Sequence, residues 1–457
     1  IYLVTDLYVS RHLEVGEIPE FPKQRLWQET FKPLVFVLDS VMENWKRFAA
    51  NWLNHRNPYT GLTWKEEPAL LSVSLVNEDT LSAYWNRTPE VAAIYRKRFE
   101  EWKKHHGISG GVASAQDPHF SRFLRELYDD GFREMKEFVR GLGLRCMISD
   151  QNFLTSPALT MMRRQYDFVE NHFYWDHPEF LGGWWKYPAG HTNLSAIARY
   201  AAAPGVLFSA RIFGRPFLVT EFDFAAPNAF RAEGGVLTGA YAALQDWDGL
   251  YRFCYEFRRE NIFSPKAPGA FSTLREPISL LTERIIWFLF VRGDVAAASN
   301  VPLAYTWNSE RYGEEFPPEF SQLGLIGRIG SVAADSKSEQ VHKVDTSRPD
   351  WIDGLPPEFR KAAERFRKKA SVTSLTGEIE LEPAKVSLRV VTPKSEVLTF
   401  HNGNARGRFL DVKNANDFAT VSVHSLDGKP LAESRDLLLF HLTDALASEE
   451  QYQTPAR

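Results

Sequence analysis

Short apolar runs alternate with longer amphipathic segments through residues 1–295. Such alternation of strands with helices predicts a parallel sheet covered by helices. Each run also leads into polar residues, and reactive groups at the carboxyl ends of strands are typical of an eight-stranded α/β barrel. The six expected strands are residues 1–9, 70–76, 144–150, 166–174, 216–222 and 242–250, with polar ends at Asp6, Glu78, Asp150, His172, Glu221 and Asp246.

Apolar residues at helical spacing mark the segments between these runs. An aspartate that caps the first turn and a proline at the first position, as in Asp117-Pro118, are typical of a helix start. An open doubly wound sheet is the alternative architecture, but it needs a glycine-rich phosphate loop, and the sequence has neither GxGxxG nor a P-loop. The expected helices are residues 38–54, 88–106, 118–141 and 278–291.

Composition excludes several classes of function. The net charge of -4 argues against binding to nucleic acid or to an anionic membrane. The longest apolar run, residues 285–291, is too short to span a bilayer. The histidines of His105-His106 and Asp117-x-His119 lack the spacing of a zinc site, so we predict neither a metal nor a cofactor. Aromatic residues reach 14%, and their flat faces suit sugar rings as well as cores.

The amino-acid composition changes after about residue 300. The length of 457 residues already exceeds that of one typical core. Residues 308–370 are rich in proline, glycine, serine and charge, and short runs with threonine, valine and turn residues follow. We therefore expect a barrel domain over 1–298, a connecting segment over 299–370, and an antiparallel β-sandwich-like domain over 371–457.

Two carboxylates stand out at the strand ends. Glu78 ends the second run, and Glu221 ends a run three strands later. Glycoside hydrolysis needs such a pair, because one acid protonates the leaving oxygen and the other carboxylate attacks the anomeric carbon or activates water. Their surroundings must hold one carboxyl protonated and the other ionised.

An ordered set of motifs over residues 1–295 resembles clan A of the glycoside hydrolases, particularly family 5 and its mannanase-like relatives. That family has Asn-Glu ending strand four, His-x-Tyr ending strand six, a nucleophilic glutamate ending strand seven and an aromatic residue ending strand eight. The matching residues here are Asn77-Glu78, His172-Phe173-Tyr174, Glu221 and Trp247, and the approach to strand four, residues 57–78, is also similar.

The resemblance implies roles for the reactive residues. Glu78 is expected to be the acid/base and Glu221 the nucleophile. Asn77 is expected to bind the sugar 2-hydroxyl, a contact that strengthens in the transition state. Tyr174 is expected to donate a hydrogen bond to Glu221 and orient it.

Three further residues are expected to line the substrate. The resemblance places His172 on the wall of the site and Trp247 beneath the reacting sugar. Asn152, which follows the strand over 144–150, is a further candidate for a sugar contact.

The count of strands departs from the family. Residues 1–9 correspond to its third strand, with Tyr8 where histidine is common, and the first two βα units have no counterpart. A barrel with six strands leaves two open edges. We therefore expect the two missing strands to come from a segment before Ile1 or from a second chain.

These features favour a retaining glycoside hydrolase that cleaves β-glycosidic bonds of an oligo- or polysaccharide on a (β/α)8 TIM barrel. One alternative is an exo-acting β-glycosidase of another clan A family, if the long insertion over 79–143 closes one end of the site. A different class is a non-catalytic carbohydrate-binding barrel, although the presence of both glutamates argues against it. The expected partner is a carbohydrate, with no nucleic acid or membrane.

Overall fold

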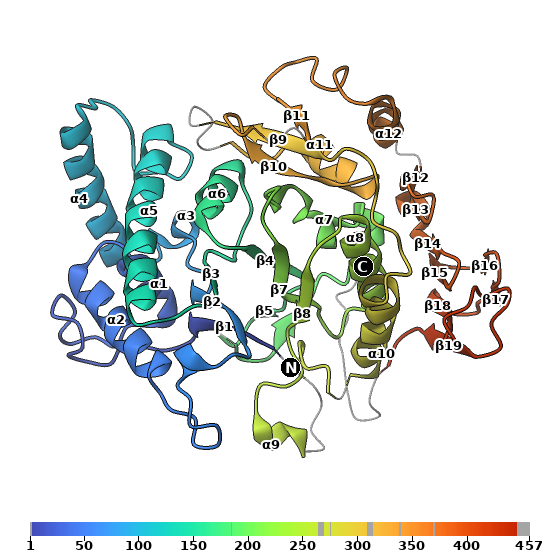
Figure 1. Cartoon of the computed structure of the whole chain (residues 1–457), viewed down its shortest axis with the longest axis horizontal. Coiled ribbons are helices and arrows are strands. Elements are labelled where there is room, and N and C mark those ends of the chain that lie inside the picture. Colours follow the sequence, from blue (N-terminus) through green and yellow to red (C-terminus); the bar gives the residue numbers. More distant parts are fainter. Residues whose placement is uncertain are drawn as a thin grey trace.

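Two three-stranded parallel sheets lie side by side at the centre of the molecule (Figure 1). This computed structural model describes residues 2–183, 185–263, 269–274, 276–308, 314–337, 340–368 and 371–445. The first sheet has the order β1 (Leu3–Tyr8), β2 (Leu70–Val76), β3 (Met147–Ser149). The second has the order β4 (Val169–Trp175), β7 (Phe217–Phe224), β8 (Gly249–Arg252).

Two backbone hydrogen bonds join the sheets between β3 and β4. Asp167 N donates to Ile148 O at 2.9 Å, and His172 N donates to Asn152 O at 2.8 Å. The six predicted strands therefore follow one another in chain order as a parallel array, which confirms that part of the prediction. Among the described residues, β1 pairs only with β2, and β8 pairs only with β7. Ile1 lies outside those residues, and the closed eight-stranded barrel stays a prediction.

The helices over β1–β3 form the first half of the molecule and surround one hydrophobic cluster, which runs from Leu7 to Tyr166. The longest, α5, begins as predicted, because the Asp117 side chain accepts hydrogen bonds from His119 N and Phe120 N. These helices are α1 (Gln28–Leu34), α2 (Asp39–Leu53), α3 (Leu81–Tyr84), α4 (Pro89–His106) and α5 (Pro118–Gly141). The insertion over 79–143 thus contributes three helices to this half of the core.

Helix α8 (Glu233–Leu244) lies at the centre of a second hydrophobic cluster, which extends from Met161 to Leu442. All of its residues are buried. Glycines allow the close approach of α10 (Pro277–Ile286), since a Cβ at Gly235 would lie 2.5 Å from Thr282 O. A π-helical turn, Trp287–Val291, continues α10, and the shorter helices nearby are α6 (Pro157–Met162), α7 (Ala202–Gly205) and α9 (Arg259–Ile262).

The strand predicted over 242–250 is only partly correct. Residues 242–244 complete α8, Asp246 turns the chain with a φ of +56°, and β8 begins at Gly249. The apolar residues at 242–244 belong to a fully buried helix, and such a run cannot be told from a buried strand by its pattern. Asp246 therefore precedes β8 instead of ending it.

The expectation of a connecting segment over 299–370 is corrected by a third parallel sheet, of order β10-β9-β11. This sheet is joined to the second half of the molecule by a β-bridge between Ile212 and Ser331. Most of its buried apolar side chains belong to the second hydrophobic cluster. Its short buried strands are separated by polar loops, which dominate the composition. The elements are β9 (Leu303–Trp307), α11 (Pro318–Gln322), β10 (Ile329–Ala333) and β11 (His342–Val344), and α12 (Pro357–Arg367) follows.

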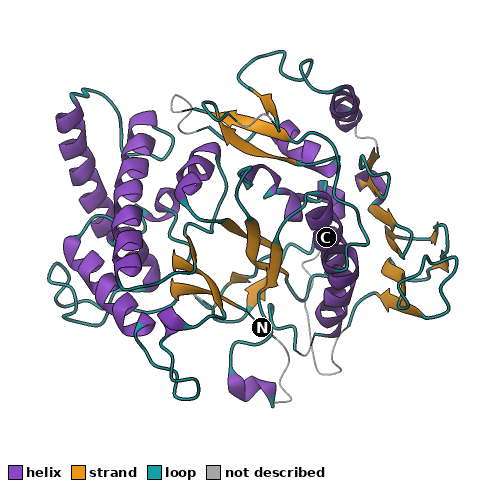
Figure 2. Cartoon of the chain, viewed as in Figure 1, coloured by secondary structure: helices purple, strands orange, loops and turns teal. Residues whose placement is uncertain are grey.

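An antiparallel sheet of six strands forms the C-terminal region, as predicted from its composition. One face joins the second cluster beside α8 and α10, and the hairpin of β16 (Asn404–Arg406) and β17 (Asp411–Lys413) covers part of the other (Figure 2). The sandwich-like form stays a prediction. The strands, in spatial order, are β12 (Val372–Thr373), β13 (Ile379–Glu382), β14 (Ser387–Val391), β15 (Ser395–His401), β18 (Phe418–Ser425) and β19 (Leu437–Leu442).

No helix within the described part of the chain has the length and apolar character needed to cross a membrane.

Candidate active site

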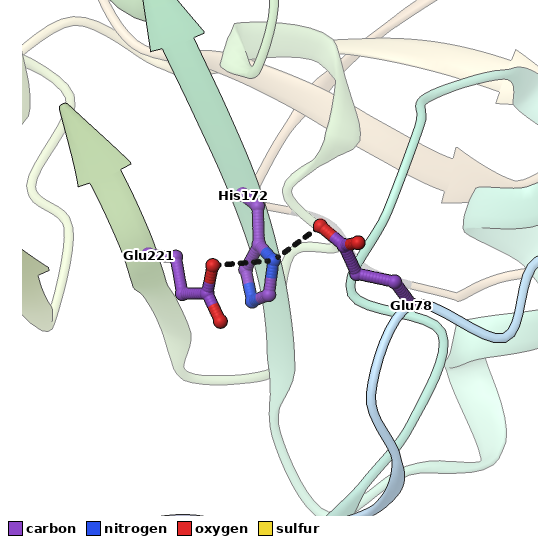
Figure 3. A group of neighbouring side chains, drawn as sticks. All are labelled: Glu78, His172 and Glu221. Atoms are coloured by element: carbon purple, nitrogen blue, oxygen red, sulfur yellow. Dashed lines mark hydrogen bonds and ion pairs between the residues drawn. The ribbon is translucent and has the colours of Figure 1, made fainter. Parts of the chain in front are cut away.

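Glu78 and Glu221 lie on either side of the His172 ring (Figure 3). His172 Nδ1 is 3.1 Å from Glu78 Oε1 and 3.5 Å from Glu221 Oε2. One oxygen of each carboxylate and a ring nitrogen of His172 all lie within 4.8 Å of one another. The glutamate side chains are 23% and 16% exposed, whereas that of His172 is 1% exposed. Both carboxylates thus reach solvent, while the imidazole is held between them.

The backbone around Glu78 is fixed by a chain of side chains from neighbouring strands. Glu78 N donates to Asn152 Oδ1 at 2.8 Å, and Asn152 Nδ2 donates to Asp6 Oδ1 at 3.1 Å. Asn77 N donates to Tyr8 O at 2.9 Å. Glu78 itself turns the chain with a φ of +51°, so its side chain leaves the line of β2 and points toward β4.

Asn152 is a positioning residue rather than the predicted sugar contact. Its side chain is fully buried, and both polar atoms are engaged, by Glu78 N and by Asp6. The prediction was wrong because proximity to a strand end does not reveal whether a side chain points outward or under the neighbouring loop.

Tyr174 donates a hydrogen bond to Glu221 Oε2, as predicted. It lies two residues after His172 in β4, so the period of a strand places both side chains on one face. Phe173 points to the other face, where its ring stacks on Phe222 at 5.5 Å between centroids. The pattern His-x-Tyr therefore delivers one side chain between the carboxylates and one beside Glu221.

Trp247 does not lie with the other site residues. It is 5% exposed and precedes β8. Its ring packs 5.2 Å from that of Phe217, the first residue of β7, whereas Glu221 lies toward the other end of that strand. The predicted sugar platform is therefore at the amino end of the sheet and is wrong. The error follows from the misplaced start of the last strand.

The side-chain amide oxygen of Asn77 is one of the polar atoms next to Glu78 that are unpaired among the described residues. Asn77 Oδ1 is buried and has no hydrogen-bond partner within the described chain. A buried acceptor without a partner is costly, so a hydroxyl donor supplied by a substrate would stabilise it. The predicted contact between Asn77 and a sugar hydroxyl stays a prediction.

His172 sets the protonation of the site. Burial alone would lower the pKa of His172, but Glu221 and Glu78 raise it to about 9. Burial would raise the pKa of Glu78, yet the hydrogen bond and charge of His172 hold it below its usual value. Burial raises the pKa of Glu221, against the opposing effects of His172 and Tyr174. At neutral pH the imidazole of His172 is therefore protonated.

Lys32 is a charged neighbour that no sequence motif indicated. It belongs to α1, is 1% exposed, and places its ammonium 5.3 Å from the centre of the Tyr84 ring. Its charge contributes to lowering the pKa of Glu78. A lysine inside a short helix far along the chain from Glu78 carries no signal in a single sequence.

The same three residues are a possible set of metal ligands, and no other such group occurs within the described chain. Two carboxylates and one imidazole suit a transition metal. In this structure Glu78, His172 and Glu221 bind one another, and the absence of a metal stays a prediction.

Two more carboxyls lie fully buried behind Glu78. Asp150 Oδ2 accepts from Tyr128 Oη at 2.8 Å and Asp150 Oδ1 accepts from Val76 N at 2.9 Å, whereas neither side-chain oxygen of Asp79 has a hydrogen-bond partner among the described residues. Burial raises the pKa of Asp79 to about 7, and burial together with Asp79 raises that of Asp150. Burial therefore favours the protonated form of each carboxyl in the folded protein.

We expect Asp79→Asn to flatten the pH dependence of the free energy of unfolding. The native state holds a proton that the unfolded chain releases above its ordinary pKa of 3.8. This contribution is fully present below pH 3.8 and is lost as the pH rises through about 7. Each pKa unit is worth about 1.4 kcal/mol, so the expected change is on the order of a few kcal/mol.

Urea unfolding measured between about pH 4 and pH 8 checks this expectation. Exposed Asp130→Asn is the control and should keep the slope of the wild type. Equal slopes for Asp79→Asn and the wild type would refute the raised pKa of Asp79 in the folded protein.

Comparison with protein-family models finds no match, and comparison with curated proteins finds none either. Solved structures of glycoside hydrolases are similar to this chain at low identity. The match to an endo-1,4-beta-D-mannanase from Thermotoga petrophila RKU-1 has 12% identity, covers 63% of this chain and 75% of that one, and has a TM-score of 0.38.

Two β-galactosidases match over more of this chain. The enzyme from Bacillus circulans sp. alkalophilus has 12% identity, with 74% of this chain and 55% of that one covered and a TM-score of 0.39. A GH42 enzyme from G. stearothermophilus has 10% identity, 88% and 65% coverage, and a TM-score of 0.39. Because TM-scores below 0.5 describe only partial overlap of two backbones, the function proposed below rests on the side chains of the site.

Proposed function

We propose that this chain is a retaining glycoside hydrolase that cleaves β-glycosidic bonds of an oligo- or polysaccharide by double displacement. The observation that carries the proposal is the facing pair, with oxygens of Glu78 and Glu221 within 4.8 Å of each other. Retaining enzymes place the two carboxyl groups roughly 5–5.5 Å apart, whereas inverting enzymes leave about 6.5–9.5 Å for a water molecule. The short separation supports direct attack by a carboxylate.

In the first step, Glu221 attacks the anomeric carbon while Glu78 donates a proton to the leaving oxygen, and the glycosidic bond breaks. Tyr174 holds Glu221 Oε2, which leaves Oε1 as the attacking atom. In the second step, Glu78 takes a proton from water, the water oxygen attacks the anomeric carbon, and Glu221 leaves as a carboxylate. Two inversions retain the configuration of the sugar.

The proton for the first step is supplied along the hydrogen bond between His172 and Glu78. In the unliganded site the proton lies on His172 Nδ1, 3.1 Å from Glu78 Oε1. Its movement to that oxygen converts an imidazolium and a carboxylate into an imidazole and a carboxylic acid, with no change in the total number of protons. Substrate that covers Glu78 and excludes water favours the neutral pair.

This arrangement predicts the alkaline limb of the pH profile. Because the active form keeps one proton that is lost as the pH rises through about 9, kcat/KM should fall above that pH. His172→Asn removes the group that stores the proton, so the alkaline limb should move down by about one pH unit or more. The measurement is kcat/KM of an aryl β-glycoside against pH.

His342→Asn is the control, because His342 lies in β11 of the third sheet and is not among the groups that shift the pKa of Glu78, His172 or Glu221. Its alkaline limb should stay near that of the wild type. If the alkaline limb of His172→Asn coincides with that of the wild type, His172 does not hold the catalytic proton. The proposed roles of the two carboxylates would not be affected by that result.

A panel of aryl β-glycosides and β-linked polysaccharides tests the proposed function itself. We expect hydrolysis, with the β anomer as the first product seen by NMR. A first-formed α anomer would contradict retention. Binding of a polysaccharide without cleavage of any substrate would favour the non-catalytic alternative, and release of single sugars from chain ends would favour the exo-acting one.

A further inference from the structure

A hollow lies beside the proposed catalytic pair, at the carboxyl ends of the same strands. It is a cavity of about 460 Å³, within the range of about 300–1,000 Å³ that is typical of small-molecule sites. One wall is formed by the segment that comes after β4 in the chain, and the other by the segment that comes after β8. Among the lining residues are Phe180, Trp185 and Tyr187 from the first loop, and Glu256, Phe257 and Phe271 from the second.

A continuous row of rings links this cavity to Glu221. Tyr174, which binds Glu221, lies 5.2 Å from the ring of Phe271, and Phe271 lies 5.6 Å from the ring of Trp185. Phe271 therefore forms one side of the cavity and supports the residue that orients the carboxylate. A ligand bound beside Glu221 extends into the cavity if it is longer than one sugar ring.

The loop that carries Trp185 is held in place before any ligand binds. The short antiparallel pair β5 (Glu179–Phe180) and β6 (Ala189–Gly190) closes it. The Trp185 ring stacks on Phe180 at 5.3 Å, and Tyr187 Oη accepts a hydrogen bond from Ala270 N at 2.9 Å. The last contact ties the two loops together, so the cavity is preformed.

The lining combines flat apolar faces with fixed polar groups. Trp185 is 41% exposed and Phe257 is 48% exposed, with their rings 5.6 Å apart in an edge-to-face arrangement. Glu256 also lines the cavity, and its carboxylate accepts hydrogen bonds from Ser272 Oγ at 2.8 Å and Asn261 Nδ2 at 3.0 Å. These hydrogen bonds, against the effect of burial, keep the pKa of Glu256 below its usual value, so it is a charged acceptor.

We propose that this cavity, lined by Trp185, Phe257 and Glu256, is a subsite for a further pyranose ring of the substrate, beyond the ring whose bond is cleaved. The inference rests on the proposed function. The apolar C–H face of a pyranose packs on the indole and phenyl rings, and its hydroxyl groups donate to the carboxylate. The chain is thereby an enzyme for oligosaccharides or polysaccharides instead of disaccharides.

Chain-length dependence tests the subsite. The probes are β-1,4-linked manno-, gluco- and galacto-oligosaccharides from disaccharide to hexasaccharide, and an aryl β-monoglycoside. We expect kcat/KM of the wild type to rise with length. Trp185→Ala should lower kcat/KM at least about tenfold on the longest cleaved substrate and less than about twofold on the monoglycoside. Phe257→Ala, a second variant on the opposite wall, should do the same.

Trp287→Ala is the matched control, because Trp287 is 46% exposed but belongs to the turn after α10 and does not line the cavity. Its length dependence should equal that of the wild type. Melting temperatures confirm folding. If Trp185→Ala and Phe257→Ala lose the same factor on every substrate length, or lose nothing, the subsite is refuted while hydrolysis still stands.

A binding measurement separates this failure from failure of the proposed function. Glu221→Gln is titrated with the hexasaccharides in a calorimeter, with and without Trp185→Ala. A loss of affinity of at least about tenfold supports the subsite even if the wild type cleaves none of the probes. Equal affinity of the two proteins for a hexasaccharide, or no binding of any hexasaccharide to Glu221→Gln, refutes it.

Discussion

Glu221→Ala should abolish turnover of every glycoside that the wild type cleaves, with kcat lower by at least about 10⁴-fold, as expected when a nucleophile is removed. The variant has no carboxylate to form the glycosyl-enzyme, and Tyr174 loses its acceptor. Steady-state rates on an aryl β-glycoside measure the loss. Because the missing side chain leaves space beside the anomeric carbon, added azide should restore part of the rate and give the α-glycosyl azide.

A fluorosugar with a good leaving group provides a direct readout of the same residue. Slow deglycosylation should leave the sugar attached to Glu221 of the wild type, visible as a mass increase on its peptide. The matched control is Glu126→Ala, a partly buried glutamate of α5 that pairs with Arg122 away from the site. Full activity of Glu221→Ala on any cleaved substrate would refute its role.

Glu78→Ala should have an effect that depends on the leaving group. With a poor leaving group, loss of the general acid should lower kcat/KM by about 10²–10⁴-fold. With an activated dinitrophenyl leaving group, bond cleavage needs no proton, so kcat/KM should change little. The second step still needs a base, so kcat should fall and the glycosyl-enzyme should accumulate, giving a burst of released phenol.

Azide also distinguishes the roles of the two glutamates. In Glu78→Ala it should attack the glycosyl-enzyme and give the β-glycosyl azide, opposite in configuration to the product from Glu221→Ala. The pKa order of the unliganded site, with Glu78 lowered and Glu221 raised, is the reverse of what the assigned roles need during the first step. If the two variants exchange these product configurations, Glu221 is the acid and Glu78 is the nucleophile.

The pairing of Glu78 with Glu221 was predictable from the sequence because it depends on strand order alone. Parallel strands bring their carboxyl ends to one edge, whatever the length of the segments between them. The place of His172 and Tyr174 on one face follows from the period of a strand. These local rules need no knowledge of packing.

The predictions that failed concern features that tertiary packing determines. Trp247 was misplaced because residues 242–244 end a helix that is buried on all sides, and such a helix has no polar face to reveal it. Asn152 was misjudged because the direction of a loop side chain depends on its neighbours. The sheet of β9 to β11 was missed because its strands are short and its loops carry most of the residues.

The two glutamates of the proposed catalytic pair come from two separately packed halves of the molecule. Glu78 belongs to the half built around the cluster from Leu7 to Tyr166, and Glu221 to the half built around the cluster from Met161 to Leu442. The bond from His172 N to Asn152 O lies where the halves meet. The distance between the two carboxylates is thus set by how the two halves pack against each other. Substitutions along that boundary can retune the rate without touching either acid, whereas changes deep inside one half leave the spacing intact.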